Sequence, residues 1–380
     1  MNKRLIFCAA LTFSLLTGMS QTAFYKHMEG KVGENISIVL DIVITGEKVG
    51  GYYYYFFDDR SDDAAWIHYG KSMPVYGVVK NDSIVEFSEF NPAVKGALFK
   101  GVIKDGRISG IWTSSNGLKQ LPFEVSENYP PGTMSFRVMH HASQSPLFKK
   151  PGSPTASLEM SLLLPESDMD GAVSDSVTAF IYREFFSDAI PGQDPDHLLN
   201  TVKALYFKNY KSANEDIYQE GAASFNWEKI KEVRILHNEH DVLSLENYDY
   251  GFTGGAHGLS FSKFQAIDLK DGHRIVLDEI FRDGYRNDLR DIIHQEVLNL
   301  YDLERNQSLT DAGFYNDYID PSDNFYLTKD GIGFYYNQYE IAPFAMGPVD
   351  IFLNYNKIKR ILRTGSPVYR LIIRGQILPD

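Results

Sequence analysis

The chain has 380 residues, of which 43% are hydrophobic and 23% charged, and its formal net charge is −13. Such a composition indicates a folded globular protein, and the acidic balance argues against nucleic acid and anionic lipid as partners. At roughly 150 residues per domain, the length predicts two or three domains, each large enough to bury its own core.

The first residues have the pattern of a secretory signal. In Met1–Ser20, Lys3 and Arg4 precede an apolar stretch that ends in small residues, so we expect the mature chain to begin near Gln21. The single cysteine, Cys8, lies within this apolar stretch; we interpret it as removed with the signal, the alternative being a lipid anchor. We therefore expect no disulfide and no membrane span in the mature chain, and a periplasmic, cell-surface or secreted location.

Residues 21–128 are predicted to form a β-rich domain. Apolar residues alternate along Ile36–Ile44, and Asn81-Asp82 and Asp105-Gly106 are turn signals between short apolar runs. Consecutive hairpins of this kind predict a meander or a small barrel. Tyr52, Tyr54, Trp66 and Trp112 are interpreted as strand aromatics of the core, with a ligand-stacking surface as the alternative.

Residues 129–133 are predicted to be a linker, because Pro130, Pro131 and Gly132 cannot continue a sheet. Residues 134–380 then mix strands with amphipathic helices. Helical spacing gives a first helix one apolar face, made of Val173, Val177, Phe180, Ile181 and Phe185. A second helix follows the N-cap signal Asp194-Pro195.

A third helix is predicted at 286–302, and strands are predicted on either side of it. One side of this helix carries the apolar residues Leu289, Ile292, Ile293, Val297 and Leu300. Strands and helices in this mixed order predict an α+β domain whose helices pack on an antiparallel sheet. The predicted fold class of the whole chain is α+β, with the β-rich N-terminal region preceding this domain.

Two segments carry a family resemblance: Tyr248–Gly258, which contains Gly254-Gly255-Ala256-His257-Gly258, and Tyr339–Pro348. Together they resemble an exported bacterial family of unknown function. Its domain forms the lysozyme-sensing region of an anti-sigma factor and lies beside the catalytic domain of a peptidoglycan deacetylase. The resemblance implies a binding domain covering roughly 134–380, with a lysozyme-like protein or a peptidoglycan fragment as partner.

The candidate ligand-binding residues come from these two segments. They are Gly254, Gly255, His257, Tyr339, Glu340 and Pro343. The glycines suit a tight backbone path, and the histidine is interpreted as tying a turn through its ring nitrogens. On that interpretation, loss of a buried hydrogen bond in His257→Ala would cost ~1–3 kcal/mol.

Other patterns give little support for catalysis, and no cofactor or metal is predicted. The polar stretch His237–Asp241 is interpreted as a hairpin turn, with a metal site as the alternative. Asp58–Asp63 lacks the ligand spacing of a calcium loop, and Ser260–Lys263 matches a serine acyl-enzyme motif only in a segment predicted as strand.

We therefore expect a non-enzymatic binding protein of the cell envelope, without predicting its oligomeric state. The alternative is an envelope hydrolase that uses His257 with a nearby carboxylate, namely Glu340, Asp268 or Asp278. The two hypotheses differ in whether His257 and a carboxylate face one open cleft.

Overall fold

The computed structural model describes residues 23–57, 68–90, 95–166, 171–187, 192–219 and 223–373. The predicted export signal, Trp66 and the acidic stretch Asp58–Asp63 lie outside these residues. Within the described part of the chain, every helix is too short or too polar to cross a membrane.

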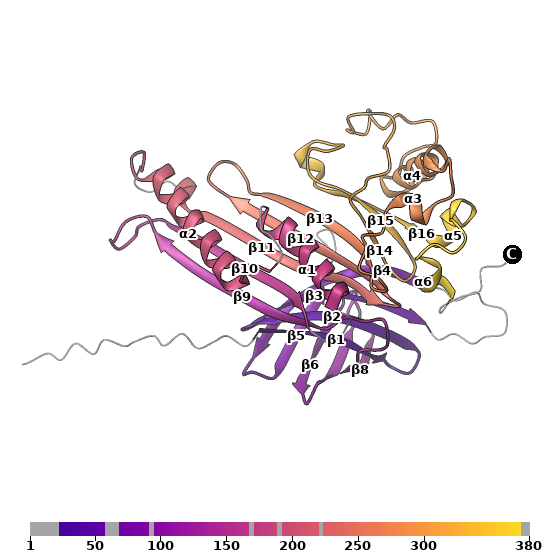
Figure 1. Cartoon of the computed structure of the whole chain (residues 1–380), viewed down its shortest axis with the longest axis horizontal. Coiled ribbons are helices and arrows are strands. Elements are labelled where there is room, and N and C mark those ends of the chain that lie inside the picture. The colour runs from indigo at the N-terminus through magenta and orange to yellow at the C-terminus, as the bar shows by residue number, and fades with distance from the viewer. Residues whose placement is uncertain are drawn as a thin grey trace, which may run out of the picture.

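An eight-stranded antiparallel barrel forms the N-terminal part (Figure 1). Each strand pairs with the next, and β1 pairs with β8 to close the barrel. The strands are β1 Ala23–Val32, β2 Ile36–Thr45, β3 Lys48–Phe57, β4 His68–Lys80, β5 Ile84–Glu89, β6 Leu98–Lys104, β7 Arg107–Thr113 and β8 Gln120–Glu127. The predicted meander or small barrel is confirmed.

Alternate residues of the barrel strands point inward or outward, as a two-residue period requires. Tyr53 is buried in the barrel against Phe99, with ring centroids 5.3 Å apart. The neighbouring Tyr52 and Tyr54 point outward and contact the second part of the molecule. The aromatic residues of β3 therefore pack alternately into the barrel core and into the interface between the barrel and the rest of the chain.

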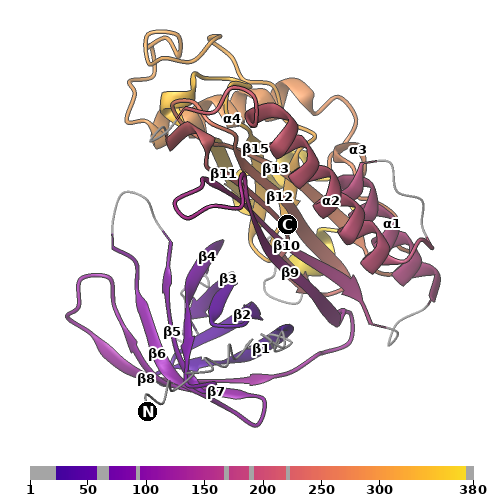
Figure 2. The same ribbon diagram turned by 90° about the vertical axis from the view of Figure 1, so that its left-hand side faces the viewer.

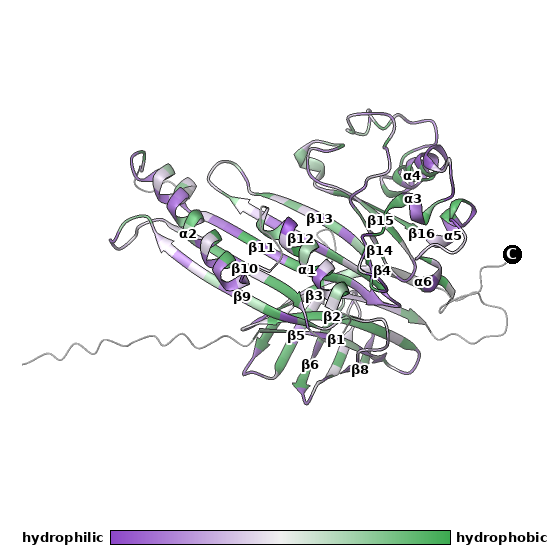
Figure 3. Cartoon of the chain, viewed as in Figure 1, coloured by the Kyte–Doolittle hydropathy of each residue, from purple (hydrophilic) through white to green (hydrophobic). Residues whose placement is uncertain are grey.

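A five-stranded sheet follows, in the order β13-β12-β11-β10-β9. Its strands are β9 Phe136–Pro146, β10 Thr155–Pro165, β11 Trp227–Glu239, β12 Val242–Phe252 and β13 Leu259–Asp268. All neighbours are antiparallel except β10 and β11, which are parallel because two helices connect them in sequence. Hydrophobic and polar segments are interspersed along these strands (Figure 3).

Helices and barrel occupy opposite faces of the five-stranded sheet (Figure 2). The two helices are α1 Gly171–Phe186 and α2 Pro195–Asn214. The apolar face predicted for α1 is buried, and Asp194 caps α2 by accepting hydrogen bonds from the backbone of Asp196 and His197. The helices that connect β10 and β11 thus cover one face of the five-stranded sheet, and the barrel packs on the other face.

A second, three-stranded sheet is formed by β14 Phe325–Leu327, β15 Gly331–Tyr336 and β16 Val349–Asn354. The elements around it are α3 Leu277–Ile280, α4 Arg286–Leu300, α5 Tyr355–Ile358 and α6 Tyr369–Ile373, with 3-10 turns η1 Ala223–Phe225, η2 Phe344–Met346 and η3 Lys359–Ile361. The predicted third helix is confirmed as α4. Leu300, which was assigned to its apolar side, is 53% exposed at the last turn.

Side-chain amides join the two sheets along the edge of β13. The backbone N–H groups of Ser262 and Phe264 donate to Asn337 and Asn324, each at 2.7 Å, and Ser260 donates to Gln338 at 3.3 Å. These amides occupy the positions that an added strand would take, so they protect the edge against pairing with another chain. They also bring the chain after β15 next to the β12–β13 loop.

Candidate functional site

The two loops that carry the sequence motifs meet at one end of the molecule. The imidazole of His257, in the β12–β13 loop, stacks on the ring of Phe344, with centroids 3.6 Å apart and planes 14° apart. The ring of Tyr339 lies 5.8 Å from that of Phe344. We call His257, Tyr339 and Phe344 the aromatic surface.

The glycines of the motif have the backbone role expected of them. Gly254 and Gly255 have φ values of +91° and +105°, in the region that glycine adopts without strain. A Cβ at Gly254 would lie 2.6 Å from the carbonyl oxygen of Ser224. The loop therefore needs glycine to pass η1 and present His257.

The candidate side chains are presented to solvent. His257 is exposed, and its Nδ1 donates to the Gly258 carbonyl at 3.1 Å. Tyr339 is 52% exposed. Glu340 and Pro343 are exposed as well, and Glu340 accepts a hydrogen bond from Asn337 at 3.1 Å. Flat rings held open to solvent suit stacking against a ligand.

Further apolar side chains extend this region. The backbone N–H of Tyr315, a residue that is 48% exposed, donates to the Ile341 carbonyl at 2.9 Å, which fixes Tyr315 beside the Tyr339 loop. Leu259 and Phe261, two residues apart on β13, are 49% and 50% exposed. Phe344 is not among the residues predicted for the site, because its contact with His257 spans 87 positions and no local pattern indicates it.

Two of the carboxylates named for a hydrolase have other partners, and one of them lies far from His257. Asp268 ends β13, so the ten-residue strand separates it from the loop by about 30 Å, and it pairs with Arg370 at 2.7 Å. Asp278 accepts a hydrogen bond from the Tyr285 hydroxyl at 2.9 Å. Of the three, Glu340 alone shares a loop with the aromatic surface.

A second polar region lies where the barrel meets the five-stranded sheet. Arg234 on β11 pairs with Glu232 at 2.7 Å and with Glu246 at 3.4 Å, and its guanidinium lies 3.8 Å from the centroid of the Tyr248 ring. The Tyr52 hydroxyl of the barrel donates to Glu246 at 2.8 Å. Burial acts to lower the pKa of Arg234, but the two carboxylates outweigh it and hold that pKa above its usual range.

A cavity of about 190 Å³ lies beside Arg234. Side chains of both signs line it, including Asp41, Lys48, Glu159 and Glu232. Pockets for small organic ligands are usually about 300–1,000 Å³. This cavity is therefore too small for a sugar unit with its substituents, and it gives no argument for a glycan site.

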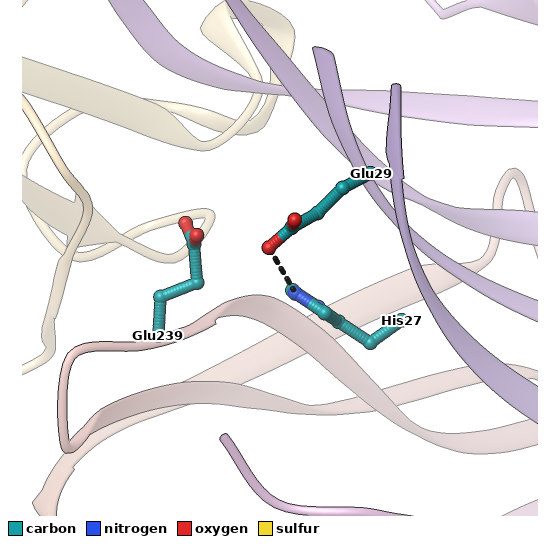
Figure 4. Close-up of side chains that lie close together, drawn as sticks. All are labelled: His27, Glu29 and Glu239. Atoms are coloured by element: carbon teal, nitrogen blue, oxygen red, sulfur yellow. Dashed lines mark ion pairs between the residues drawn. The ribbon is translucent and has the colours of Figure 1, made fainter. Parts of the chain in front are cut away.

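A histidine and three carboxylates form the junction cluster, defined as His27, Glu29, Asp41 and Glu239. Figure 4 shows Glu29 and Glu239 approaching His27 from the barrel and from the end of β11. The His27 ring is fully buried, and its Nδ1 lies 2.8 Å from Asp41. Burial lowers and Asp41 raises the pKa of His27, with a net rise to about 10. Burial raises the pKa of Glu239 to about 7.

The stretch His237–Asp241 is only partly the solvated turn that the sequence indicates. His240 and Asp241 form the tight turn between β11 and β12, with φ values of +57° and +61°. His237, Asn238 and Glu239 are instead buried against the barrel. The Asn238 side chain donates to the Tyr25 hydroxyl at 2.9 Å and to the Met134 carbonyl at 2.7 Å.

The fold is an antiparallel barrel followed by an α+β unit, and the α+β unit is similar to two protein families. The family model described as "Deacetylase PdaC" matches residues 158–260, which include Gly254–Gly258. The model described as "Protein of unknown function (DUF3298)" matches residues 278–356, which include Tyr339–Pro348. The resemblance predicted from these two motifs is confirmed, and its lysozyme-sensing aspect stays a prediction.

Individual proteins show the same similarity. The peptidoglycan-N-acetylmuramic acid deacetylase PdaC of Bacillus subtilis (strain 168) is 23% identical over 170 residues, which are 44% of this chain and 36% of that protein. The chain thus spans about a third of the length of this curated relative. A crystal structure of a DUF3298 family member from Bacteroides fragilis has 27% identity and a TM-score of 0.57, covering 63% of this chain and 97% of that one.

Proposed function

We propose that this is an exported cell-envelope protein that binds a peptidoglycan-derived glycan through the aromatic surface, without modifying it. The observation that carries the proposal is the stacked pair His257 and Phe344 with the exposed Tyr339 beside it. Sugar rings present apolar faces that pack on aromatic rings, while their hydroxyl groups bond to polar neighbours such as Glu340.

The comparisons support an envelope glycan as the ligand class. The matched part of the chain resembles a protein whose name states that it acts on peptidoglycan. Together with the secretory pattern of Met1–Ser20, this favours a periplasmic, cell-surface or secreted location. Binding is favoured over hydrolysis because His257 stacks on a ring, and two of the three carboxylates considered for catalysis are engaged elsewhere.

The test is titration of the mature chain with a purified disaccharide–tetrapeptide muropeptide, followed by calorimetry. Tyr339→Ala and Phe344→Ala should each weaken binding about tenfold or more, as central aromatic contacts usually do. The matched control is Phe90→Ala on the barrel, because Phe90 is 57% exposed but distant in sequence and fold from the two loops. Equal affinities for all three variants would contradict the proposed surface.

Two further measurements separate the alternatives. Mass spectrometry of the muropeptide after incubation should find it unchanged, whereas a deacetylated or cleaved product would support the hydrolase hypothesis. Titration with lysozyme at two salt concentrations tests the protein partner, since the acidic chain should then bind more weakly as ionic strength rises. Lysozyme binding without muropeptide binding would replace the glycan by a protein ligand.

A further inference from the structure

A set of side chains at the junction has the composition and placement of a cation site. Alternation along β1 puts Tyr25, His27 and Glu29 on the outer face of the barrel, opposite the end of β11. There the ligand atoms of His27, Glu29 and Glu239 all lie within 4.8 Å of one another (Figure 4). The three residues come from two separate sheets, so only the packing of barrel on sheet assembles them.

Two of the buried groups point into this site without a hydrogen-bond partner. The His27 side chain is fully buried, and its Nε2 makes no hydrogen bond; the nearest carboxylate oxygen, on Glu29, is 3.9 Å away. Glu239 is 6% exposed, and its Oε2 also makes no hydrogen bond. Burying such groups unpaired is costly, and a cation between them would satisfy both.

An outer set of hydrogen bonds orients these groups. The Asp41 carboxylate can only accept, so His27 donates Nδ1–H to it, and Nε2 on the other side of the ring faces the two glutamates. Asp41 also accepts a hydrogen bond from the Tyr25 hydroxyl at 2.5 Å, and Asn128 donates to Glu29 at 2.8 Å. A carboxylate on the far nitrogen of a ligating histidine is the usual second layer of a metal site.

The local charge also favours a cation. Three carboxylates, on Glu29, Asp41 and Glu239, surround one imidazole. These carboxylates outnumber the nearby cation Lys329, whose ammonium group lies 4.0 Å from the centroid of the Phe56 ring and whose charge acts to lower the pKa of Glu29 and Glu239. The Glu29 side chain is 33% exposed, which gives an ion a route from solvent.

We propose that His27, Glu29 and Glu239 bind one divalent transition-metal ion that fastens the barrel to the five-stranded sheet. One imidazole nitrogen with two carboxylate ligands suits Zn²⁺ or Mn²⁺ better than Ca²⁺ or Mg²⁺, which prefer ligand sets made of oxygen. Three protein ligands leave at least one position for water. The alternative to a metal ion on Nε2 is a proton, and the experiment below distinguishes metal binding from protonation.

The experiment uses the full mature chain, treated with chelator, dialysed and titrated with ZnCl2 by calorimetry. One ion should bind per chain, MgCl2 should not replace it, and excess zinc should raise the Tm by ~2 °C or more. Glu239→Gln and Glu29→Gln keep the side-chain shape, and each should weaken zinc binding at least ~10-fold and remove the Tm rise. Circular dichroism and cooperative unfolding in urea verify that these variants fold.

A matched control comes from the group Asp268, Asp271 and His273, whose ligand atoms are equally close together and of which Asp271 is exposed. Its members already have ionic partners, since Asp268 pairs with Arg370 and His273 with Asp271 and Glu279. His273→Gln should therefore leave zinc binding unchanged. Absence of saturable zinc binding by the wild type, equal affinity in Glu239→Gln, or loss of binding in His273→Gln would each overturn the proposal.

Discussion

The interface between the barrel and the five-stranded sheet, which we call the junction, and the aromatic surface use polar and aromatic side chains in opposite ways. At the junction, Arg234 and Glu246 are largely buried and held by several partners each. At the aromatic surface, His257 and Tyr339 are exposed, and ring contacts hold them more than hydrogen bonds do. Buried charges fix how the two parts of the chain pack, whereas exposed rings remain available to a ligand.

The largest expected effect follows from breaking the buried charge network. Arg234→Leu removes the cation from Glu232 and Glu246, and the Glu246 side chain is only 4% exposed. The uncompensated carboxylate should lower the free energy of unfolding by ~3–5 kcal/mol in urea titrations. Arg183→Leu, at an exposed pair with Glu184, is the control and should change it by less than ~0.5 kcal/mol. A similar loss of stability in both variants would show that the buried ion pairs contribute no more than the exposed pair.

A pH dependence should come from His237, which is fully buried and makes no hydrogen bond through either ring nitrogen. Burial, with smaller effects from His240, His27 and Lys329, lowers its pKa to about 3. The unfolded histidine titrates near 6.5, so between pH 6.5 and 3 the unfolded chain binds the additional proton. The contribution of His237 to the free energy of unfolding should therefore fall, by about 2–4 kcal/mol, as the pH drops through this window, while Glu239, whose pKa is raised to about 7, acts in the opposite direction.

His237→Leu tests this origin, because leucine fills similar space and does not titrate. Urea unfolding of the wild type and the variant should be compared at several pH values between 6.5 and 4. The variant should show the smaller loss of stability on acidification. Parallel pH profiles would show that other groups cause the acid sensitivity.

The smallest effect is expected at the aromatic surface. His257→Ala removes an exposed ring that stacks on Phe344 and bonds only to its own loop, so the free energy of unfolding should fall by less than ~1 kcal/mol. This is below the ~1–3 kcal/mol expected for a buried hydrogen bond. Thermal unfolding measures the change. A larger loss would mean that the surface supports the fold as the junction does.

Local patterns in the sequence predicted much of the fold. Alternating residues in β2, turn signals between hairpins, the apolar face of α1 and the Asp194 cap of α2 all depend on neighbours within a few positions. The structure confirms the β-rich region followed by helices on a sheet. Independent folding of residues 21–128 and 134–380 stays a prediction.

Barrel closure, the parallel β10–β11 pair and both candidate sites were decided only by tertiary structure. His257 meets Phe344, and His27 meets Glu239, across long stretches of sequence. The periodicity of a strand shows only on which side of the sheet a residue lies. Which residue of another element it contacts depends on how the elements pack, so no local pattern predicts such pairs. The sequence does not predict His27 and Glu29 as site residues. Polar residues that point outward from a barrel strand look like a solvated face, and only the second sheet covers these two.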